Sequence, residues 1–238
     1  MLGTRDLATR IAFMLCAVLP ISPGAAHAQS ADELNELGKA HYKKGKIDAA
    51  LADFERALKL DPKFVKAYSN RGALRHEKKD YEGALADLNR AIELDPKLNA
   101  AYFNRGLVYE SLRELDKALA DYDTFIKSDT KSALAYAYRG NVKSRNGNYD
   151  GPLADYARAL ELEPKNAFIY HYRGDAKLAQ GDLDGAIGDY DRAIELNPKI
   201  ALTFRQRSIA KKKKGDHDGS MADFWSAREI ENAEAGLK

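Results

Sequence analysis

Large, small and charged side chains return along residues 31–234 at a constant spacing of 34 residues. The dipeptide Arg-Gly marks this period most clearly, since it occurs at 71–72, 105–106, 139–140 and 173–174. The same frame divides the chain without an insertion into repeats one to six: 31–64, 65–98, 99–132, 133–166, 167–200 and 201–234. A fixed period of this length predicts an array in which each repeat buries its apolar side chains against its neighbours.

Within each repeat, the order of large and small side chains predicts two helices. Large side chains occupy positions 4 and 24, and small ones occupy positions 8, 20 and 27, so two helices can approach closely where the small side chains meet. Glycine at position 15 is expected to end the first helix, aspartate or asparagine at position 16 to cap the second, and proline at position 32 to end it. These residues are Gly45, Gly147, Gly181 and Gly215; Asp80, Asn148, Asp182 and Asp216; and Pro62, Pro96, Pro164 and Pro198.

Three Asp-Gly dipeptides at positions 18 and 19 resemble the turns of β-hairpins. They are Asp150-Gly151, Asp184-Gly185 and Asp218-Gly219. No strand pattern flanks them, and the helical period continues through them. We therefore interpret them as the first turn of the second helix, where acidic side chains suit the helix dipole.

With these residues in place, the sequence resembles the tetratricopeptide repeat family over residues 31 to about 234. The resemblance implies an all-α fold: a right-handed α-solenoid of six antiparallel helix pairs, whose first helices line a concave groove that binds a protein or peptide. The sequence departs from the family pattern at position 7, where five repeats carry arginine in place of leucine. Positions 11 and 12 are also irregular, and Tyr109 is the only aromatic residue at position 11.

The resemblance also implies which side chains face the groove, because positions 2, 5, 9, 12 and 13 do so in this family. The candidate partner-binding residues are Lys39, Tyr42, Ala73, His76, Phe103, Leu107, Asn141, His171 and Arg205. Phe103 and Leu107 lie four residues apart and would form an apolar anchor in the centre of the groove. The alternative is that both pack against adjacent first helices. The clamp with which part of the family grips C-terminal carboxylates is incomplete in every repeat, which disfavours a receptor for chaperone tails.

Arginine at position 7 and aspartate at position 23 form a repeating set of opposite charges. The arginines are Arg71, Arg105, Arg139, Arg173 and Arg207, and the aspartates are Asp53, Asp87, Asp121, Asp155, Asp189 and Asp223. Each aspartate could pair within its own repeat or with the arginine of the next. We expect the forward pairing, because repeat one carries Leu37 at position 7 and no repeat precedes it.

The first and last parts of the array carry different signals. At position 28, Arg228 replaces the leucine or isoleucine of the first five repeats, which indicates a terminal cap. Trp225 either covers this end or marks a contact surface.

Repeat three is unusual because Phe125, Ser128 and Thr130 replace a small residue, an apolar residue and proline. These three replacements mean either local repacking or a functional kink.

Residues 1–28 have the order of a secretory signal peptide. Arg5 and Arg10 precede a short apolar stretch at residues 11–21, and Ala26-His27-Ala28 forms a small-x-small cleavage site. We expect cleavage after Ala28, which leaves residues 29–30 as a short lead and 235–238 as a C-terminal tail. An uncleaved anchor is the alternative. The expected compartment is the periplasm, with the extracellular medium second, and the mature chain has no stable membrane span.

Charge and composition narrow the function further. The chain has 238 residues, and its 38 basic and 36 acidic side chains are interleaved, which disfavours a nucleic-acid partner. The only cysteine, Cys16, lies in the signal segment. The remaining histidines, His41, His76, His171 and His217, fall where none has a partner at metal-ligand spacing.

We therefore expect no enzyme activity, no catalytic residue, no metal and no cofactor. The expected function is a non-catalytic scaffold or adaptor that binds a protein or peptide in the cell envelope. A self-associating structural scaffold, joined through the ends of the array, is the alternative. The sequence favours a monomer over a self-associated form.

Overall fold

The computed structural model describes residues 29–146 and 150–236. The predicted signal peptide, 1–28, lies outside the described residues. So do Gly147 and Asn148, which were expected to end one helix and cap the next. Nothing in the structure therefore bears on these predictions.

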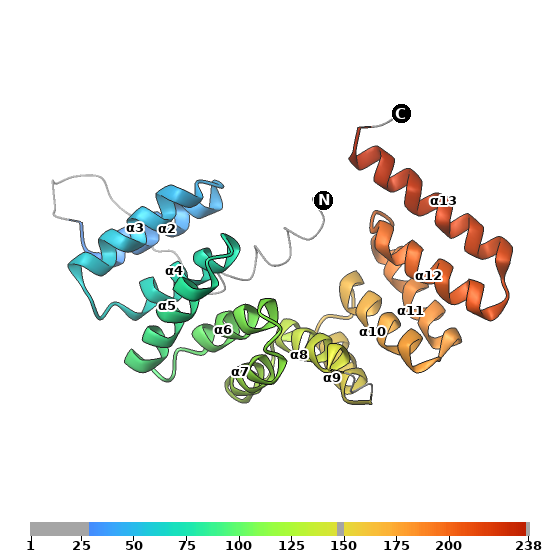
Figure 1. Cartoon of the computed structure of the whole chain (residues 1–238), viewed down its shortest axis with the longest axis horizontal. Helices are drawn as coiled ribbons and strands as arrows, with labels where there is room; N and C mark the ends of the chain where they lie inside the picture. The colour runs from blue at the N-terminus through green and yellow to red at the C-terminus, as the bar shows by residue number, and fades with distance from the viewer. Residues whose placement is uncertain (1–28, 147–149, 237–238) are drawn as a thin grey trace. The chain divides into compact units, whose positions relative to one another are not determined.

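The described residues form twelve α-helices and no strand (Figure 1). The first six are α2 (Ala31–Lys43), α3 (Ile47–Leu60), α4 (Val65–Glu77), α5 (Tyr81–Leu94), α6 (Asn99–Ser111) and α7 (Leu115–Ser128). The other six are α8 (Ala133–Arg145), α9 (Asp150–Leu162), α10 (Ala167–Gln180), α11 (Leu183–Leu196), α12 (Ala201–Lys214) and α13 (His217–Glu234). The even-numbered helices begin at residues 31, 65, 99, 133, 167 and 201, and each is the first helix of a repeat.

The helices pack in consecutive pairs, as the sequence predicts. Within a repeat, α2 packs on α3, α4 on α5 and α6 on α7, and the same holds for α8 on α9, α10 on α11 and α12 on α13. Two compact units result, one ending at Ser128 and one beginning at Asp129. Inside each compact unit, every second helix also packs on the first helix of the next repeat.

The helix pairs approach closely where position 8 lacks a side chain. A Cβ atom added to Gly106 would lie 2.7 Å from Cε1 of Tyr122, the large residue at position 24 of the same repeat. In repeat six, position 8 is Ser208, whose hydroxyl donates to the carbonyl oxygen of Ser220 at 2.7 Å. Positions 8 and 20 therefore meet between the two helices, and the predicted role of the small residues is confirmed.

Position 15 adopts the left-handed backbone conformation at the end of the first helix in the five repeats where this position is described. Gly181 has φ of 84° and Gly215 has φ of 91°. Repeats two and three have no glycine here, yet Lys79 and Arg113 adopt φ of 63° and 62°. Two non-glycine side chains therefore occupy a conformation that costs about 1 kcal/mol or more for an L-residue.

Aspartate at position 16 caps the second helix as predicted. The Asp182 carboxylate accepts a hydrogen bond from the Gly185 backbone N–H at 2.9 Å, and Asp216 accepts one from Gly219 at the same distance. A Cβ atom on Gly185 would collide with this carboxylate, so the glycine makes room for the cap. The Asp-Gly dipeptides lie in the first turns of helices, as we expected, and form no hairpins.

Candidate protein-binding surfaces

Arginine and aspartate pair within each repeat, which contradicts the forward pairing that we expected. Arg105 is 2.7 Å and 2.8 Å from the two carboxylate oxygens of Asp121, through Nη2 and Nε. The same two-point contact joins Arg71 to Asp87, Arg139 to Asp155, Arg173 to Asp189 and Arg207 to Asp223. The forward prediction was wrong because residue counts alone fit both arrangements, whereas helix packing brings position 7 against position 23 of the same pair.

A second cation at position 11 completes most of these buried sites. Arg75 contacts Asp87, Lys143 contacts Asp155, Lys177 contacts Asp189 and Lys211 contacts Asp223, at 2.8–2.9 Å. In repeat one, where position 7 is Leu37, the His41 Nδ1 lies 2.6 Å from Asp53. This role was not predicted, because position 11 is aromatic in the family and was considered only as an irregular aromatic position. The sequence feature that could have indicated it is the basic or imidazole side chain that five repeats share at position 11.

Arginine at position 7 does reach the preceding repeat, but at position 25. The Arg105 Nη1 donates to Asn89 Oδ1 at 2.7 Å, and the Arg207 Nη1 donates to Asp191 Oδ1 at 2.6 Å. The hydrogen bond to Asp121 raises the pKa of the Arg105 guanidinium against the opposing effect of its burial. These charges hold the helix pairs and their junctions together.

Four of the predicted groove residues are buried. Phe103 is 4% exposed, and its ring centroid lies 5.5 Å from that of Tyr122 and 5.2 Å from that of Phe125. Tyr42, Ala73 and His171 are also buried. The expected protruding ring of Phe103 is thus absent, and the alternative of packing in the core describes this residue.

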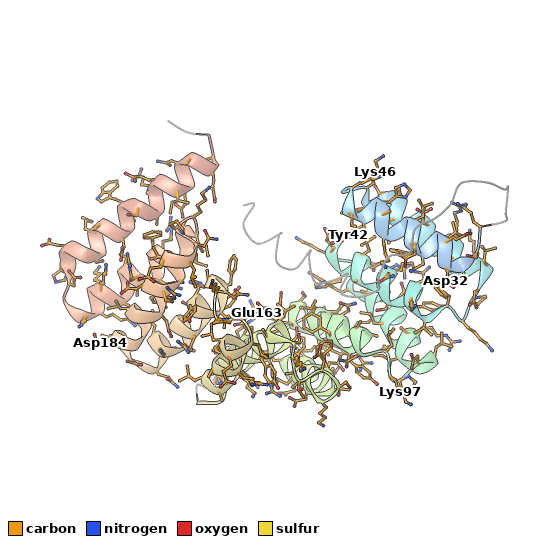
Figure 2. The ribbon with its side chains drawn as sticks, turned by 180° about the vertical axis from the view of Figure 1, so that it is seen from behind. Asp32, Tyr42, Lys46, Lys97, Glu163 and Asp184 are labelled. Carbon is orange, nitrogen blue, oxygen red and sulfur yellow. The ribbon has the colours of Figure 1, made fainter. Side chains whose placement is uncertain are left out.

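In repeat one, positions 5 and 12 are buried because their side chains contact repeat two. At position 5, the Asn35 side chain accepts a hydrogen bond from Asn70 of repeat two at 2.8 Å. At position 12, the Tyr42 hydroxyl donates to Glu77 at 2.9 Å. Burial and the nearby Glu77 carboxylate raise the pKa of the Tyr42 phenol far above its usual range. Figure 2 shows Tyr42 near one end of the α2–α3 pair and Asp32 towards the other.

His171 forms a buried polar cluster in the second compact unit. Its Nδ1 lies 3.1 Å from the Thr203 hydroxyl, and its Nε2 lies 3.4 Å from Asp175 without forming a hydrogen bond. The Tyr190 hydroxyl donates to the same Asp175 carboxylate at 2.8 Å. Burial lowers the pKa of His171 and raises the pKa of Asp175. These shifts follow from packing between α10, α11 and α12.

The other five predicted residues keep part of their surface. Lys39, His76, Leu107 and Asn141 are half-buried, and Arg205 is exposed. His76 lies 2.8 Å from the Ser111 hydroxyl, and burial lowers its pKa. Arg205 forms a two-point ion pair with Glu231 of α13, at 2.7 and 2.5 Å. These residues belong to two compact units, and each unit presents its own part of the predicted surface.

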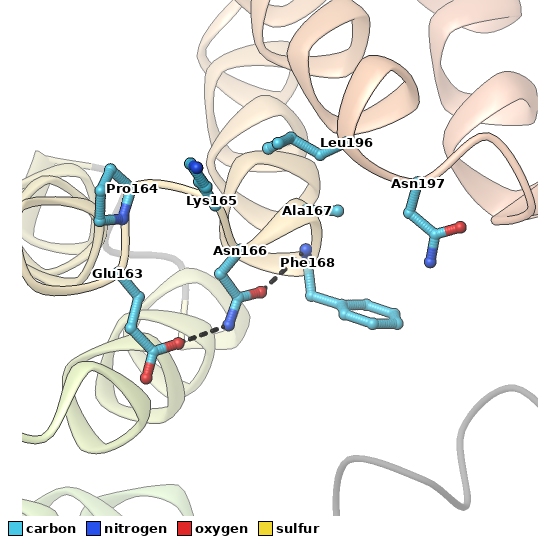
Figure 3. Close-up of a pocket in the computed structure, with 8 residues that line it drawn as sticks. All are labelled: Glu163, Pro164, Lys165, Asn166, Ala167, Phe168, Leu196 and Asn197. Carbon is cyan, nitrogen blue, oxygen red and sulfur yellow. Dashed lines mark hydrogen bonds between the residues drawn. The ribbon is translucent and has the colours of Figure 1, made fainter.

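A shallow pocket of about 540 Å³ lies in the second compact unit, where the α9–α10 connection meets the end of α11 (Figure 3). Its lining is formed by Glu163, Pro164, Lys165, Asn166, Ala167, Phe168, Leu196 and Asn197. Asn166 donates to the Glu163 carboxylate at 2.8 Å and accepts from the Phe168 backbone N–H at 3.1 Å. Of the positions that face the family's groove, the pocket contains position 2, as Phe168.

The last repeat exposes large apolar side chains. Met221 is 57% exposed, Trp225 50% and Phe224 41%, whereas the equivalent of Phe224 is buried in every earlier repeat. The Arg228 guanidinium lies over the Trp225 ring, 5.6 Å from its centroid. Trp225 therefore remains half-exposed beside a charged residue and leaves this end of the array open.

Neither metal chemistry nor a membrane span is indicated in the described part of the chain. In residues 29–146 and 150–236, no three histidine, cysteine, aspartate or glutamate side chains gather closely enough to hold a metal ion. None of the helices in these ranges is long and apolar enough to cross a membrane.

These helix pairs, their spacing and their small-residue contacts define a tetratricopeptide repeat protein. Models of the tetratricopeptide repeat match residues 35–99, 84–133 and 167–200, and the chain belongs to this family. No curated protein matches the chain.

Solved structures share the fold. A tetratricopeptide repeat protein from Parabacteroides merdae ATCC 43184 is 23% identical, with a TM-score of 0.69 over 82% of this chain and 78% of that one. TTC0263, a thermophilic protein of Thermus thermophilus, is 26% identical, with a TM-score of 0.62 over 76% and 98%. YrrB, described as having an unusual peptide-binding site, is 21% identical, with a TM-score of 0.61 over 74% and 91%.

Proposed function

We propose that this protein is a non-catalytic scaffold of the cell envelope that binds a protein or peptide partner on the first helices of its repeats. The observation that carries the proposal is the use of its buried charges. Each aspartate at position 23 is held by an arginine of its own repeat, so these carboxylates have a structural role. We therefore look for the binding function among the accessible side chains.

The accessible first-helix residues are the binding candidates. In the first compact unit, Leu107 of repeat three supplies apolar surface, and Lys39 of repeat one and His76 of repeat two supply polar groups. In the second, Asn141 and Arg205 supply hydrogen-bonding groups, and Phe168 adds an aromatic side chain in the shallow pocket. Apolar anchors among polar groups are typical of protein-binding surfaces. The peptide-binding site described for YrrB, which shares the fold, supports a peptide as one form of the partner.

A pull-down with matched leucine variants tests the binding surface. Leu107→Glu should abolish capture of partners from an envelope extract, because a charge in an apolar contact costs about 2 kcal/mol or more. Leu60→Glu is the control, since Leu60 is 59% exposed on α3, a second helix. Equal capture by the two variants would contradict binding on the first helices.

Export is tested separately. When the full chain is expressed in a Gram-negative cell, we expect it in the periplasmic fraction rather than in the medium. Its intact mass should correspond to a chain that begins at Gln29. Retention of residues 1–28 in the exported protein would contradict cleavage and favour an anchor.

A further inference from the structure

The side chains at the two ends of the array differ in charge and hydrophobicity from those at the same positions in its internal junctions. The changes at one end are complementary to the changes at the other. The front face consists of exposed or half-buried side chains on and just after α2: Glu33, Glu36, Leu37, Ala40 and Lys44. The back face consists of exposed side chains on α12 and α13: Arg205, Asp218, Phe224, Trp225 and Arg228. Inside each compact unit, particular repeat positions meet at the junctions between repeats, and these contacts provide a register for comparing the two faces.

Position 28 of one repeat packs with position 3 of the next. Leu58 shares a buried cluster with Ala67, and Leu160 shares one with Ile169. At the ends of the array, both positions become charged and opposite in sign. Position 28 is Arg228 on the back face, and position 3 is Glu33 on the front face.

Position 25 of one repeat contacts the arginine at position 7 of the next, as Asn89 contacts Arg105. At both ends of the array, the polar residue of this contact is replaced by a large apolar residue. Repeat six alone has tryptophan at position 25, and repeat one alone has leucine at position 7. In the register of an internal junction, Trp225 would lie against Leu37, so an apolar pair would replace a polar one.

Position 24 packs with position 10 of the next repeat, as Tyr190 packs with Ala210. The ends preserve this combination of a large ring and an alanine, with Phe224 on the back face and Ala40 on the front face. Phe224 is 41% exposed, whereas Tyr190 is fully buried. The back face therefore lacks the small apolar side chain that covers a ring at an internal junction.

Two internal polar contacts also have complementary residues at the same positions on the two end faces. Position 18 pairs with position 14 of the next repeat, as Asp48 does with Lys78 at 2.7 Å, and the ends carry Asp218 and Lys44. Position 5 meets position 6 of the next repeat through Asn35 and Asn70, and the ends carry Arg205 and Glu36. Within one copy, Arg205 pairs with Glu231 and Glu36 pairs with Lys39, so a contact between copies would share these charges. Opposite charges thus face each other in the same register.

One pair of positions would bring two like charges together between the end faces. Positions 12 and 13 meet as Tyr42 and Glu77 inside the array, but as Lys212 and Lys43 at the ends. Both lysines are exposed, and their flexible side chains can separate into water. This single unfavourable pair stands against three opposite-charge pairs and two apolar pairs.

We propose that the back face of one copy binds the front face of a second copy in the register of an internal junction, so that chains associate head to tail. Each copy keeps one face free, and the contact is heterologous. Association of this kind closes into rings or continues into filaments, and does not stop at a two-fold dimer. The proposal does not rest on the proposed function, although Arg205 belongs to both surfaces.

Trp225 provides a direct readout, because it is the only tryptophan in the chain. The full chain is studied by sedimentation velocity and tryptophan emission over a wide concentration range. We expect the sedimentation coefficient to rise with concentration and the emission maximum to move to shorter wavelength as the ring is covered. A single monomeric species with unchanged emission up to millimolar concentration would overturn the proposal.

Charge reversal tests the register. Arg228→Glu and Glu33→Arg each place like charges at the junction, so each variant alone should associate about tenfold or more weakly than the unmodified chain. An equal mixture of the two variants restores opposite charges at every junction and should associate again. A mixture that stays dissociated, or single variants that associate like the unmodified chain, would overturn this register.

Two controls separate these effects from folding. Glu33 also accepts a hydrogen bond from the Ser30 backbone N–H in the capping box of α2. Ser30→Ala weakens the same cap without a change of charge and should preserve association. Arg90→Glu reverses an exposed arginine of α5 outside both faces and should also preserve it. Loss of association in either control would contradict the assignment to the two faces.

Discussion

The Arg105 guanidinium grips Asp121 of its own repeat through two hydrogen bonds, at 2.7 and 2.8 Å, and the aspartate is 4% exposed. A buried carboxylate held at both oxygens is stable only while its cation remains. The contact therefore locks the two helices of a repeat together, whereas the link to the preceding repeat depends on the separate Asn89 contact.

A double-mutant cycle distinguishes pairing within a repeat from forward pairing. Substitution of Arg105 and Asp121 by alanine, singly and together, should reveal a coupling energy of about 1–3 kcal/mol in the free energy of unfolding. The same cycle on Arg105 and Asp87 should give a coupling close to zero. Chemical denaturation measures both, and a larger coupling with Asp87 would restore the forward pairing.

Phe103 should behave as a core residue. Phe103→Ala is expected to lower the free energy of unfolding by about 3–5 kcal/mol, because the ring packs on Tyr122 and Phe125. Leu107→Ala should cost less, since Leu107 is half-buried. Thermal unfolding of both variants checks the ranking. Equal, small losses would mean that the Phe103 ring contributes little to packing.

Lys79 offers a route to higher stability. Lys79→Gly should raise the free energy of unfolding by roughly 0.5–1 kcal/mol, because glycine accepts the φ of 63° that strains lysine. Lys78→Gly is the matched control and should destabilise, since Lys78 has an ordinary φ of −76°. Denaturant midpoints of the two variants should move in opposite directions, and a shift in the same direction would argue against strain at Lys79.

His171 should make stability depend on pH. Burial lowers its pKa below the ordinary value of 6.5, so the unfolded chain binds a proton that the folded chain resists. The free energy of unfolding therefore falls as the pH drops below about 6.5, by at most about 1.4 kcal/mol per pH unit from this group. The raised pKa of Asp175 acts in the opposite direction at lower pH.

The variant His171→Gln should flatten this dependence between pH 7 and 5, with urea unfolding as the measurement. Part of the slope should remain, because burial also lowers the pKa of His76. His217→Gln removes an exposed histidine and is the control. If the two variants have the same slope, His171 does not cause it.

The helix pairs could be predicted from the sequence because most of their structural signals recur at the same repeat positions. Glycine, aspartate and aromatic residues that share one 34-residue frame leave little freedom in where helices begin and end. The caps at Asp182 and Asp216 follow from local chemistry alone, since the partner N–H lies three residues away. The left-handed backbone of Lys79 could be inferred only from its place in the frame.

The binding surface was harder to predict because burial depends on how the helices pack. Phe103 occupies a position that faces the groove in the family, but in this chain Phe125 replaces a small residue, and the two rings pack together. Likewise, the distance in sequence between Arg105 and either aspartate does not decide the pairing. The packing of the helices decides both, and a pattern of residue types does not specify that packing.

Ion pairing within a repeat has a consequence for how such a gene can change length. A 34-residue segment that is duplicated or deleted in frame carries both Arg173 and Asp189 with it, so no buried charge loses its counter-ion. Only a junction contact such as that between Arg207 and Asp191 must be formed anew. Under forward pairing, the buried ion pair itself would lie across each new junction and would have to form again there.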